Sequence, residues 1–187
     1  MARFSIAEPM EIVTDTLIGD TRVVIGSFGP TVAGLSRRER EREATAWLLR
    51  HTFGEDAAIE LSHAPNGAPR LRVDGGEWHL SVSHSRARAA IALSRHHRIG
   101  IDVEEWRDQL ERVRHKFIAP DEEEGWGNRL LDAWMAKEAA YKAFEPSDSI
   151  TVLSVSLHGT TASYGAARAS LHFGDGFALA VVQSPAL

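Results

Sequence analysis

Residues 99–104 alternate strictly between aliphatic and other side chains. In a β-strand the three aliphatic residues fall on one face, and Asp102 and Glu104 fall on the other face beside Gly100. Such a strand buries its aliphatic face in a core and presents two carboxylates side by side. The alternation therefore predicts a sheet that carries a polar site on one side.

A second segment, residues 134–142, is typical of a helix, and it places Glu138 and Lys142 four residues apart on one face. If this face meets the strand, three carboxylates and one ammonium group come together. Carboxylate oxygens are hard ligands that suit Mg²⁺, which usually keeps several waters and is completed by substrate phosphates.

These two segments resemble the signature of the 4′-phosphopantetheinyl transferases, which has Gly-x-Asp-x-Glu at 100–104 and Trp-x-x-Lys-Glu-x-x-x-Lys at 134–142. Residues 81–85, Ser-Val-Ser-His-Ser, resemble the Ser-His-Ser motif of the same family. Residues 117–122 resemble its acidic helix start, which contains a phenylalanine. Four motifs in this order, over roughly residues 62–145, indicate more than any one of them alone.

The resemblance implies an α+β fold of two similar lobes, each a small antiparallel sheet packed on a long helix and related by a pseudo-twofold axis. Residues 1–97 would form the N-terminal lobe with the coenzyme A nucleotide contacts, and residues 98–187 the C-terminal lobe with the catalytic carboxylates. The site would lie at their junction. The two sequence halves are not visibly similar, so the repeat rests on the resemblance, as does a monomeric state.

The resemblance also assigns the metal site. Asp102, Glu104 and Glu138 would coordinate Mg²⁺, with Mn²⁺ as the alternative, together with the pyrophosphate of coenzyme A, and Lys142 would lie against the phosphates. Glu138 would accept the proton of the attacking serine, directly or through a metal-bound water, and Glu122 is a second candidate for assisting it. In isolation, the strand pair would be a solvated face and the helix pair a surface ion pair; the joint pattern favours the site.

Further side chains are expected to contact coenzyme A, namely Ser83, His84, Arg42, Arg50 and Arg70. The arginine-rich segment 37–42 is also consistent with a salt-bridged, solvated helix face. The chain departs from the family at Ala46, where an arginine is common, and at Ala68, where the family has lysine in Gly-Lys-Pro. Both departures concern the nucleotide end of coenzyme A rather than the metal site.

The implied function is transfer of 4′-phosphopantetheine from coenzyme A to a serine of an apo acyl or peptidyl carrier protein, with release of adenosine 3′,5′-bisphosphate. One alternative is a non-catalytic relative that binds coenzyme A or a carrier protein. Another is a different Mg²⁺-dependent phosphotransferase or a nuclease, which the lack of a Walker-type loop and of a strong basic groove disfavours. The pathway of the carrier protein is not specified by the sequence.

The composition favours a cytoplasmic protein without membrane or nucleic-acid partners. No apolar run approaches the roughly 20 residues that cross a bilayer, and the first residues lack the apolar stretch of a secretory signal. The absence of cysteine excludes disulfides and thiolate metal sites. A formal charge of −5 argues against a general nucleic-acid binder.

Propensity and turn residues predict the remaining elements. Ser36 and Glu39 form a capping-box pattern for a helix that reaches about residue 51. Residues 64–69 predict a turn by composition. Strands are expected at 11–17, 21–28, 78–83, 89–93, 151–157, 168–173 and 177–182, and helices at 107–117 and 128–144, the last ended by Pro146.

Overall fold

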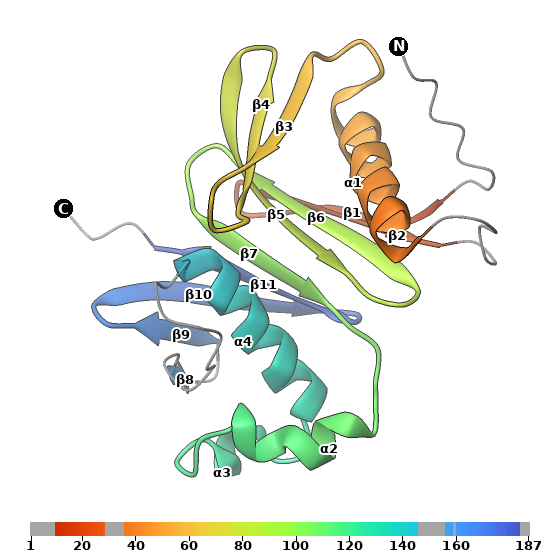
Figure 1. Ribbon diagram of the computed structural model, residues 1–187. Coiled ribbons are helices and arrows are strands. Elements are labelled where there is room, and N and C mark those ends of the chain that lie inside the picture. Colours follow the sequence, from red (N-terminus) through yellow and green to blue (C-terminus); the bar gives the residue numbers. More distant parts are fainter. Residues whose placement is uncertain (1–9, 29–35, 146–155, 159, 184–187) are drawn as a thin grey trace.

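The computed structural model describes residues 10–28, 36–145, 156–158 and 160–183, and it shows an α+β fold with two antiparallel sheets (Figure 1). The first sheet has the strand order β1-β2-β6-β5-β4-β3 and the second β7-β11-β10-β9-β8. In chain order the strands of the first sheet are β1 (Glu11–Ile18), β2 (Thr21–Ser27), β3 (Ile59–His63), β4 (Pro69–Val73), β5 (Gly76–His84) and β6 (Arg88–Ser94). Those of the second are β7 (Ile99–Val103), β8 (Ser156–His158), β9 (Thr161–Tyr164), β10 (Ala167–Gly174) and β11 (Phe177–Val182).

One long helix, α1 (Arg37–Phe53), covers one face of the first sheet (Figure 1). It begins at Ser36, whose hydroxyl accepts the Glu39 N–H while the Glu39 carboxylate accepts the Ser36 N–H, so the predicted capping box is confirmed. Leu48 and Leu49 are fully buried against the apolar side chains of the sheet. This helix thereby carries its arginine-rich first turns at one edge of the sheet.

The second long helix, α4 (Leu130–Phe144), packs on β7, β10 and β11. Its buried face consists largely of alanines, which bring the helix backbone close to the sheet. At Gly100 the approach is so close that an added Cβ would lie 1.9 Å from the Ala139 carbonyl oxygen. Glycine at position 100 therefore allows α4 to lie directly over β7, and this sets where Glu138 and Lys142 stand relative to Asp102.

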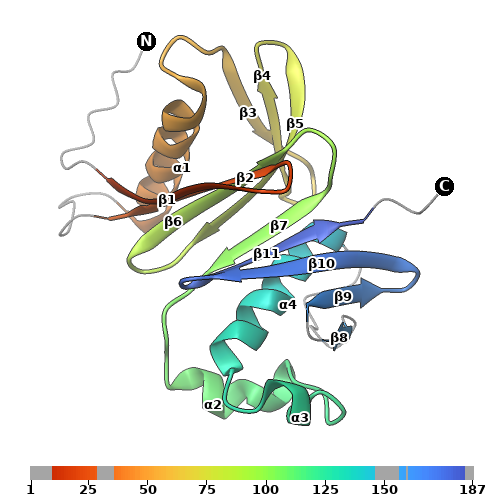
Figure 2. The same ribbon diagram turned by 180° about the vertical axis from the view of Figure 1, so that it is seen from behind.

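Strand β7 lies at the junction of the two sheets, between the first sheet and β11 (Figure 2). Its aliphatic side chains join a core cluster with β2, β6 and β11. At its outer edge, the Ile101 and Val103 N–H groups donate to the hydroxyls of Ser81 and Ser83 on β5, at 3.0 and 3.2 Å. The serine hydroxyls thus accept the N–H groups along the edge of β7 that does not pair with β11. All five residues of β7 are buried.

Most predicted elements are confirmed, with several additions. The structure adds β3, β4, β9 and the short helix α3 (Glu123–Trp126), and it resolves the expected helix at 107–117 into α2 (Gln109–Val113) and the 3₁₀ turn η1 (Arg114–Lys116). Pro146 and most of the strand expected at 151–157 lie outside the described residues. The lobe boundary at residue 97 stays a prediction. Within the described ranges, no helix has the length and apolar character required to cross a bilayer.

Candidate active site

Asp102 is the most enclosed acidic side chain at the junction, with 5% of its surface exposed. Its Oδ1 atom accepts hydrogen bonds from Lys142 Nζ and Ser83 Oγ, both at 2.8 Å. Its Oδ2 atom is buried and has no hydrogen-bond partner. Asp102 therefore does not lie on an open face of the sheet, because α4 covers this face of β7.

Glu104 follows β7 directly and Glu138 stands on α4, and both are partly buried. Burial raises the pKa of Glu104, and the charge of Asp102 adds to this while Arg107 opposes it. Burial also raises the pKa of Glu138, again with a contribution from Asp102 and opposition from Lys142 and Arg107. These mutual effects show that the structure brings the three predicted carboxylates into one electrostatic group.

Two cations offset this negative charge in the ligand-free protein. Lys142 donates to Asp102 and to the Ile101 carbonyl oxygen, at 2.8 and 2.9 Å. Arg107 donates to Glu104 Oε1 at 2.7 Å. Three carboxylates thus face two cations, so the group retains an excess of negative charge.

The chemistry of this group fits a hard divalent cation. An unpartnered carboxylate oxygen on Asp102 is a costly feature unless a ligand satisfies it, and two further carboxylates with raised pKa values lie nearby. Within the described residues, no three acidic or histidine side chains are already gathered tightly enough to enclose a metal ion. Binding would therefore require the side chains of Glu104 and Glu138 to move.

A cleft of about 580 Å³ adjoins these residues between α1, the turn at residues 66–69 and the end of α4. Lys142 lines it and so connects it to Asp102. Arg38 and Arg42 line it from α1, and His84 lines it from the end of β5. The lining is therefore mainly basic, with the carboxylates of Glu41 and Glu145 among it, and Lys142 joins it to Asp102, which does not line the cleft itself.

His84 is held by a polar pair inside this cleft. Its Nε2 atom lies 3.0 Å from Thr45 Oγ1, and the Thr45 hydroxyl donates to the Glu41 carbonyl oxygen at 2.9 Å. Because the hydroxyl proton is used there, Nε2 carries the proton and donates to Thr45. Burial lowers the pKa of His84, against an opposing effect of Glu41, so the ligand-free imidazole is neutral at pH 7.

Three of the side chains expected to contact coenzyme A do not line this cleft. Ser83 is 6% exposed. Its hydroxyl accepts the Val103 N–H and donates to Asp102 Oδ1, so Ser83 positions the Asp102 carboxylate. Arg50 lies at the end of α1 and pairs with Glu55 at 3.5 Å. Arg70 lines a different cavity, since the alternation along β4 points it away from α1.

The structure adds contacts around the site that the sequence pattern did not predict. The Glu105 carboxylate accepts from Ser85 Oγ at 2.5 Å and from the Ala87 N–H at 3.3 Å, which fixes the β5–β6 turn beside His84. Lys137 and Glu122 form a buried ion pair at 2.5 Å, which ties the segment before α3 to α4. This pair gives Glu122 a buried partner, and its role in proton transfer stays a prediction.

The motifs do not predict the contacts of Glu105 and Arg107, because both residues lie outside the segments 81–85, 100–104, 117–122 and 134–142. The only pattern that would have drawn attention to them is the group of carboxylates at 102, 104 and 105 with an arginine at 107. Comparison of the chain with models of known protein families and with curated proteins finds no match.

Proposed function

We propose that this protein transfers 4′-phosphopantetheine from coenzyme A to a serine hydroxyl of a carrier protein. The observation that carries the proposal is the unpartnered Oδ2 atom of Asp102, in a group of three carboxylates that Lys142 links to a basic cleft. The proposal includes the two-lobed arrangement, in which each sheet with its long helix, α1 or α4, forms one lobe. The motifs at 81–85, 100–104 and 134–142 support the same reaction.

In this proposal the cleft binds the nucleotide and phosphates of coenzyme A. Arg38 and Arg42 would contact its phosphates from α1, and His84 would become protonated when a phosphate dianion raises its pKa. Lys142 would exchange its bond to Asp102 for the pyrophosphate and neutralise charge as the bond breaks. Asp102 would then be free to act as a metal ligand.

The reaction is a substitution at the β-phosphorus of coenzyme A. The serine oxygen forms a bond to this phosphorus, and the bond to the bridging oxygen breaks, which releases adenosine 3′,5′-bisphosphate. Glu138 accepts the serine proton, directly or through a metal-bound water; because a metal-bound carboxylate is a weak base, the relay through water is the favoured route. Held by Asp102, Glu104 and Glu138, Mg²⁺ would supply charge stabilisation for the pyrophosphate.

The test is incubation of the protein with coenzyme A, Mg²⁺ and an apo carrier protein, followed by mass spectrometry of the carrier. A mass gain of one phosphopantetheine arm on the carrier serine supports transfer. Saturable binding of coenzyme A without any mass gain across fatty-acid, polyketide and nonribosomal-peptide carriers would instead support the non-catalytic alternative. The departures at Ala46 and Ala68 keep that alternative open, whereas the presence of all three carboxylates expected to bind the metal supports transfer.

A further inference from the structure

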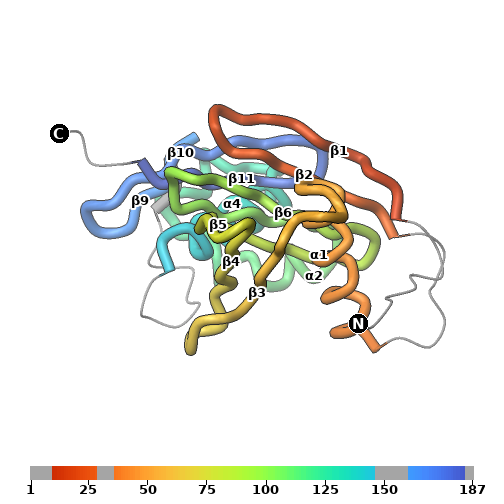
Figure 3. The backbone as a smooth tube through the Cα atoms, turned by 90° about the horizontal axis from the view of Figure 1, so that it is seen from above, coloured from red at the N-terminus to blue at the C-terminus, as the bar shows by residue number. Residues whose placement is uncertain are grey.

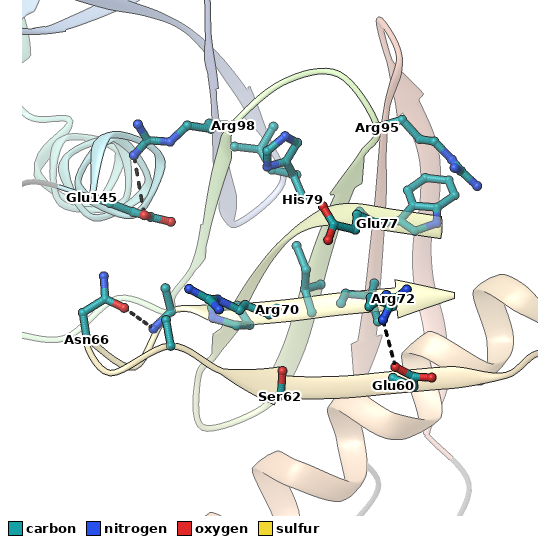
Figure 4. Close-up of a pocket in the computed structure, with 17 residues that line it drawn as sticks. Glu60, Ser62, Asn66, Arg70, Arg72, Glu77, His79, Arg95, Arg98 and Glu145 are labelled. Carbon is teal, nitrogen blue, oxygen red and sulfur yellow. Dashed lines mark hydrogen bonds and ion pairs between the residues drawn. The ribbon is translucent and has the colours of Figure 1, made fainter. Parts of the chain in front are cut away.

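A second cavity, of about 730 Å³, lies on the face of β3, β4 and β5 that points away from α1 (Figure 4). Ser62, Arg70 and His79 stand on the three strands and line its floor, and Ser62 is the register partner of Arg70. Arg95 and Arg98 line it from the end of β6 and the segment before β7. We call this space the β3–β5 cavity.

The β3–β5 cavity adjoins the candidate active site but has a different polar lining. Residues of the turn at 66–69, together with Leu80, Ile99 and Glu145, line both spaces. None of the side chains that make the cleft basic, Arg38, Arg42, His84 and Lys142, lines the second cavity.

The β3–β5 cavity is lined by charged side chains of both signs, and only some of them form ion pairs with one another. Its lining includes four arginines and three glutamates. Arg72 faces Glu60 at 3.9 Å, and Arg98 faces Glu145 at 3.7 Å while it donates to the Phe144 carbonyl oxygen. Glu60 and Glu145 are thus each paired with an arginine, and Glu77 is the third glutamate of the lining.

The remaining donors have no such partners. Within the part of the chain that the structure describes, the side chains of Ser62, Arg70 and His79 make no hydrogen bond or ion pair. Arg95 stacks on the Trp78 ring, 4.3 Å from its centroid, and has no carboxylate partner among the described residues. A hydroxyl, a guanidinium and an imidazole, all exposed to solvent, therefore line the cavity without a protein partner among the described residues.

We propose that the β3–β5 cavity binds a phosphate-bearing small molecule of mononucleotide size. A guanidinium presents paired donors that match phosphate oxygens, and a hydroxyl and an imidazole beside it add two more donors. The volume lies within the range of small-molecule sites. Pro69, Leu80 and Ile99 supply an apolar wall for the rest of the ligand.

The test uses AMP as the probe and isothermal titration of the ligand-free protein. His84→Ala serves as the background, because it removes the phosphate contact proposed for the neighbouring cleft. Arg70→Gln is added to it in one variant, and Arg168→Gln, an exposed arginine on β10 outside both cavities, in the matched control. Adenosine and inorganic phosphate are titrated alongside AMP, and His79→Gln provides a second cavity variant.

AMP is expected to bind the His84→Ala background. Arg70→Gln should weaken this binding about tenfold, because a charge-assisted hydrogen bond is lost. His79→Gln should weaken it in the same direction, and Arg168→Gln should leave it within about twofold. Inorganic phosphate should bind and adenosine should not.

The proposal is overturned if adenosine binds as well as AMP, if Arg70→Gln acts no more strongly than Arg168→Gln, or if AMP does not bind the background below about 10 mM. The titration does not depend on turnover. A negative result would therefore leave the transfer reaction untouched, and a carrier that gains no mass would leave this site untouched.

Discussion

At the scale of single residues, the two oxygens of Asp102 differ. Oδ1 is held by Ser83 and Lys142, whereas Oδ2 is buried without a partner. An unsatisfied buried carboxylate oxygen lowers the stability of the folded protein, and a bound cation or an ordered water would remove this cost. Ser83 sets the position of this carboxylate and at the same time satisfies the edge of β7.

Ser83→Ala is predicted to lower the free energy of unfolding by about 1–3 kcal/mol, because Val103 N–H and Asp102 Oδ1 both lose a buried partner. Urea unfolding at pH 7 measures the change. Ser62→Ala is the control, since that hydroxyl is exposed, and it should stay within about 0.5 kcal/mol. Equal stability of the two variants would contradict the dual role of Ser83.

Arg107→Gln is predicted to tighten Mg²⁺ binding about three- to tenfold in the absence of coenzyme A. The Arg107 guanidinium competes for Glu104 and also acts on Glu138, so its removal favours a cation among the carboxylates. Titration calorimetry at low ionic strength gives the affinity. Arg112→Gln, an exposed arginine on α2, should change nothing. An unchanged affinity in Arg107→Gln would remove Arg107 from the metal site.

At the scale of elements, the contact between β7 and α4 depends on a single glycine. Gly100→Ala places a Cβ 1.9 Å from the Ala139 carbonyl oxygen, so α4 has to move. A loss of about 3 kcal/mol or more is expected in thermal or urea unfolding, at the upper end of overpacking effects. Gly125→Ala is the control, because its Cβ would meet no atom within 4 Å. A Gly100→Ala protein as stable as Gly125→Ala would mean that α4 does not lie where the structure has it.

The β1–β2 hairpin is tied to α1 by Asp15, which pairs with Arg22 at 2.8 Å and with His51 at 3.0 Å. The hydrogen bond from Arg22 is the main cause that lowers the pKa of Asp15 to about 2. A lowered carboxyl pKa stabilises the fold above the unfolded value of 3.8. This stabilisation is lost as the pH falls toward 2.

Asp15→Asn should therefore cost about 1 kcal/mol at pH 7, a value reduced for the solvent screening of this half-exposed pair. The difference from wild type should shrink between pH 3.8 and about 2. Denaturant unfolding at a series of pH values measures it. A difference that persists unchanged at pH 2 would assign the loss to packing instead of charge.

At the scale of the whole molecule, the sequence predicted the elements with strong local signals. The capping box at Ser36, the alternation of β7 and the two strands expected at 168–173 and 177–182 all appear in the structure. Strand β3 was missed because its side chains are almost all exposed, so it has no apolar alternation to detect. The sequence also could not show that α4 covers Asp102, since this depends on the Gly100 contact.

The same limit applies to the site. The spacing at 100–104 and 134–142 predicted the three carboxylates and Lys142, and the structure brings them into one electrostatic group. The direction of the Arg70 side chain was harder to predict. Successive residues of a strand point to opposite faces, and Arg70 lies on the face of β4 that lines the β3–β5 cavity and not the cleft. Side-chain direction on a short, exposed strand is not encoded by composition.

The central claim is that the carboxylates at the junction of the two sheets carry out metal-dependent transfer to a carrier protein. The most direct measurement is the mass of an apo carrier after incubation with coenzyme A and wild-type protein, Glu138→Gln or Glu124→Gln, each with Mg²⁺ or with EDTA. Wild type and Glu124→Gln, whose changed residue is exposed on α3, should add one phosphopantetheine arm with Mg²⁺ and none with EDTA. Glu138→Gln should add none in either condition, and near wild-type transfer by Glu138→Gln would contradict the claim.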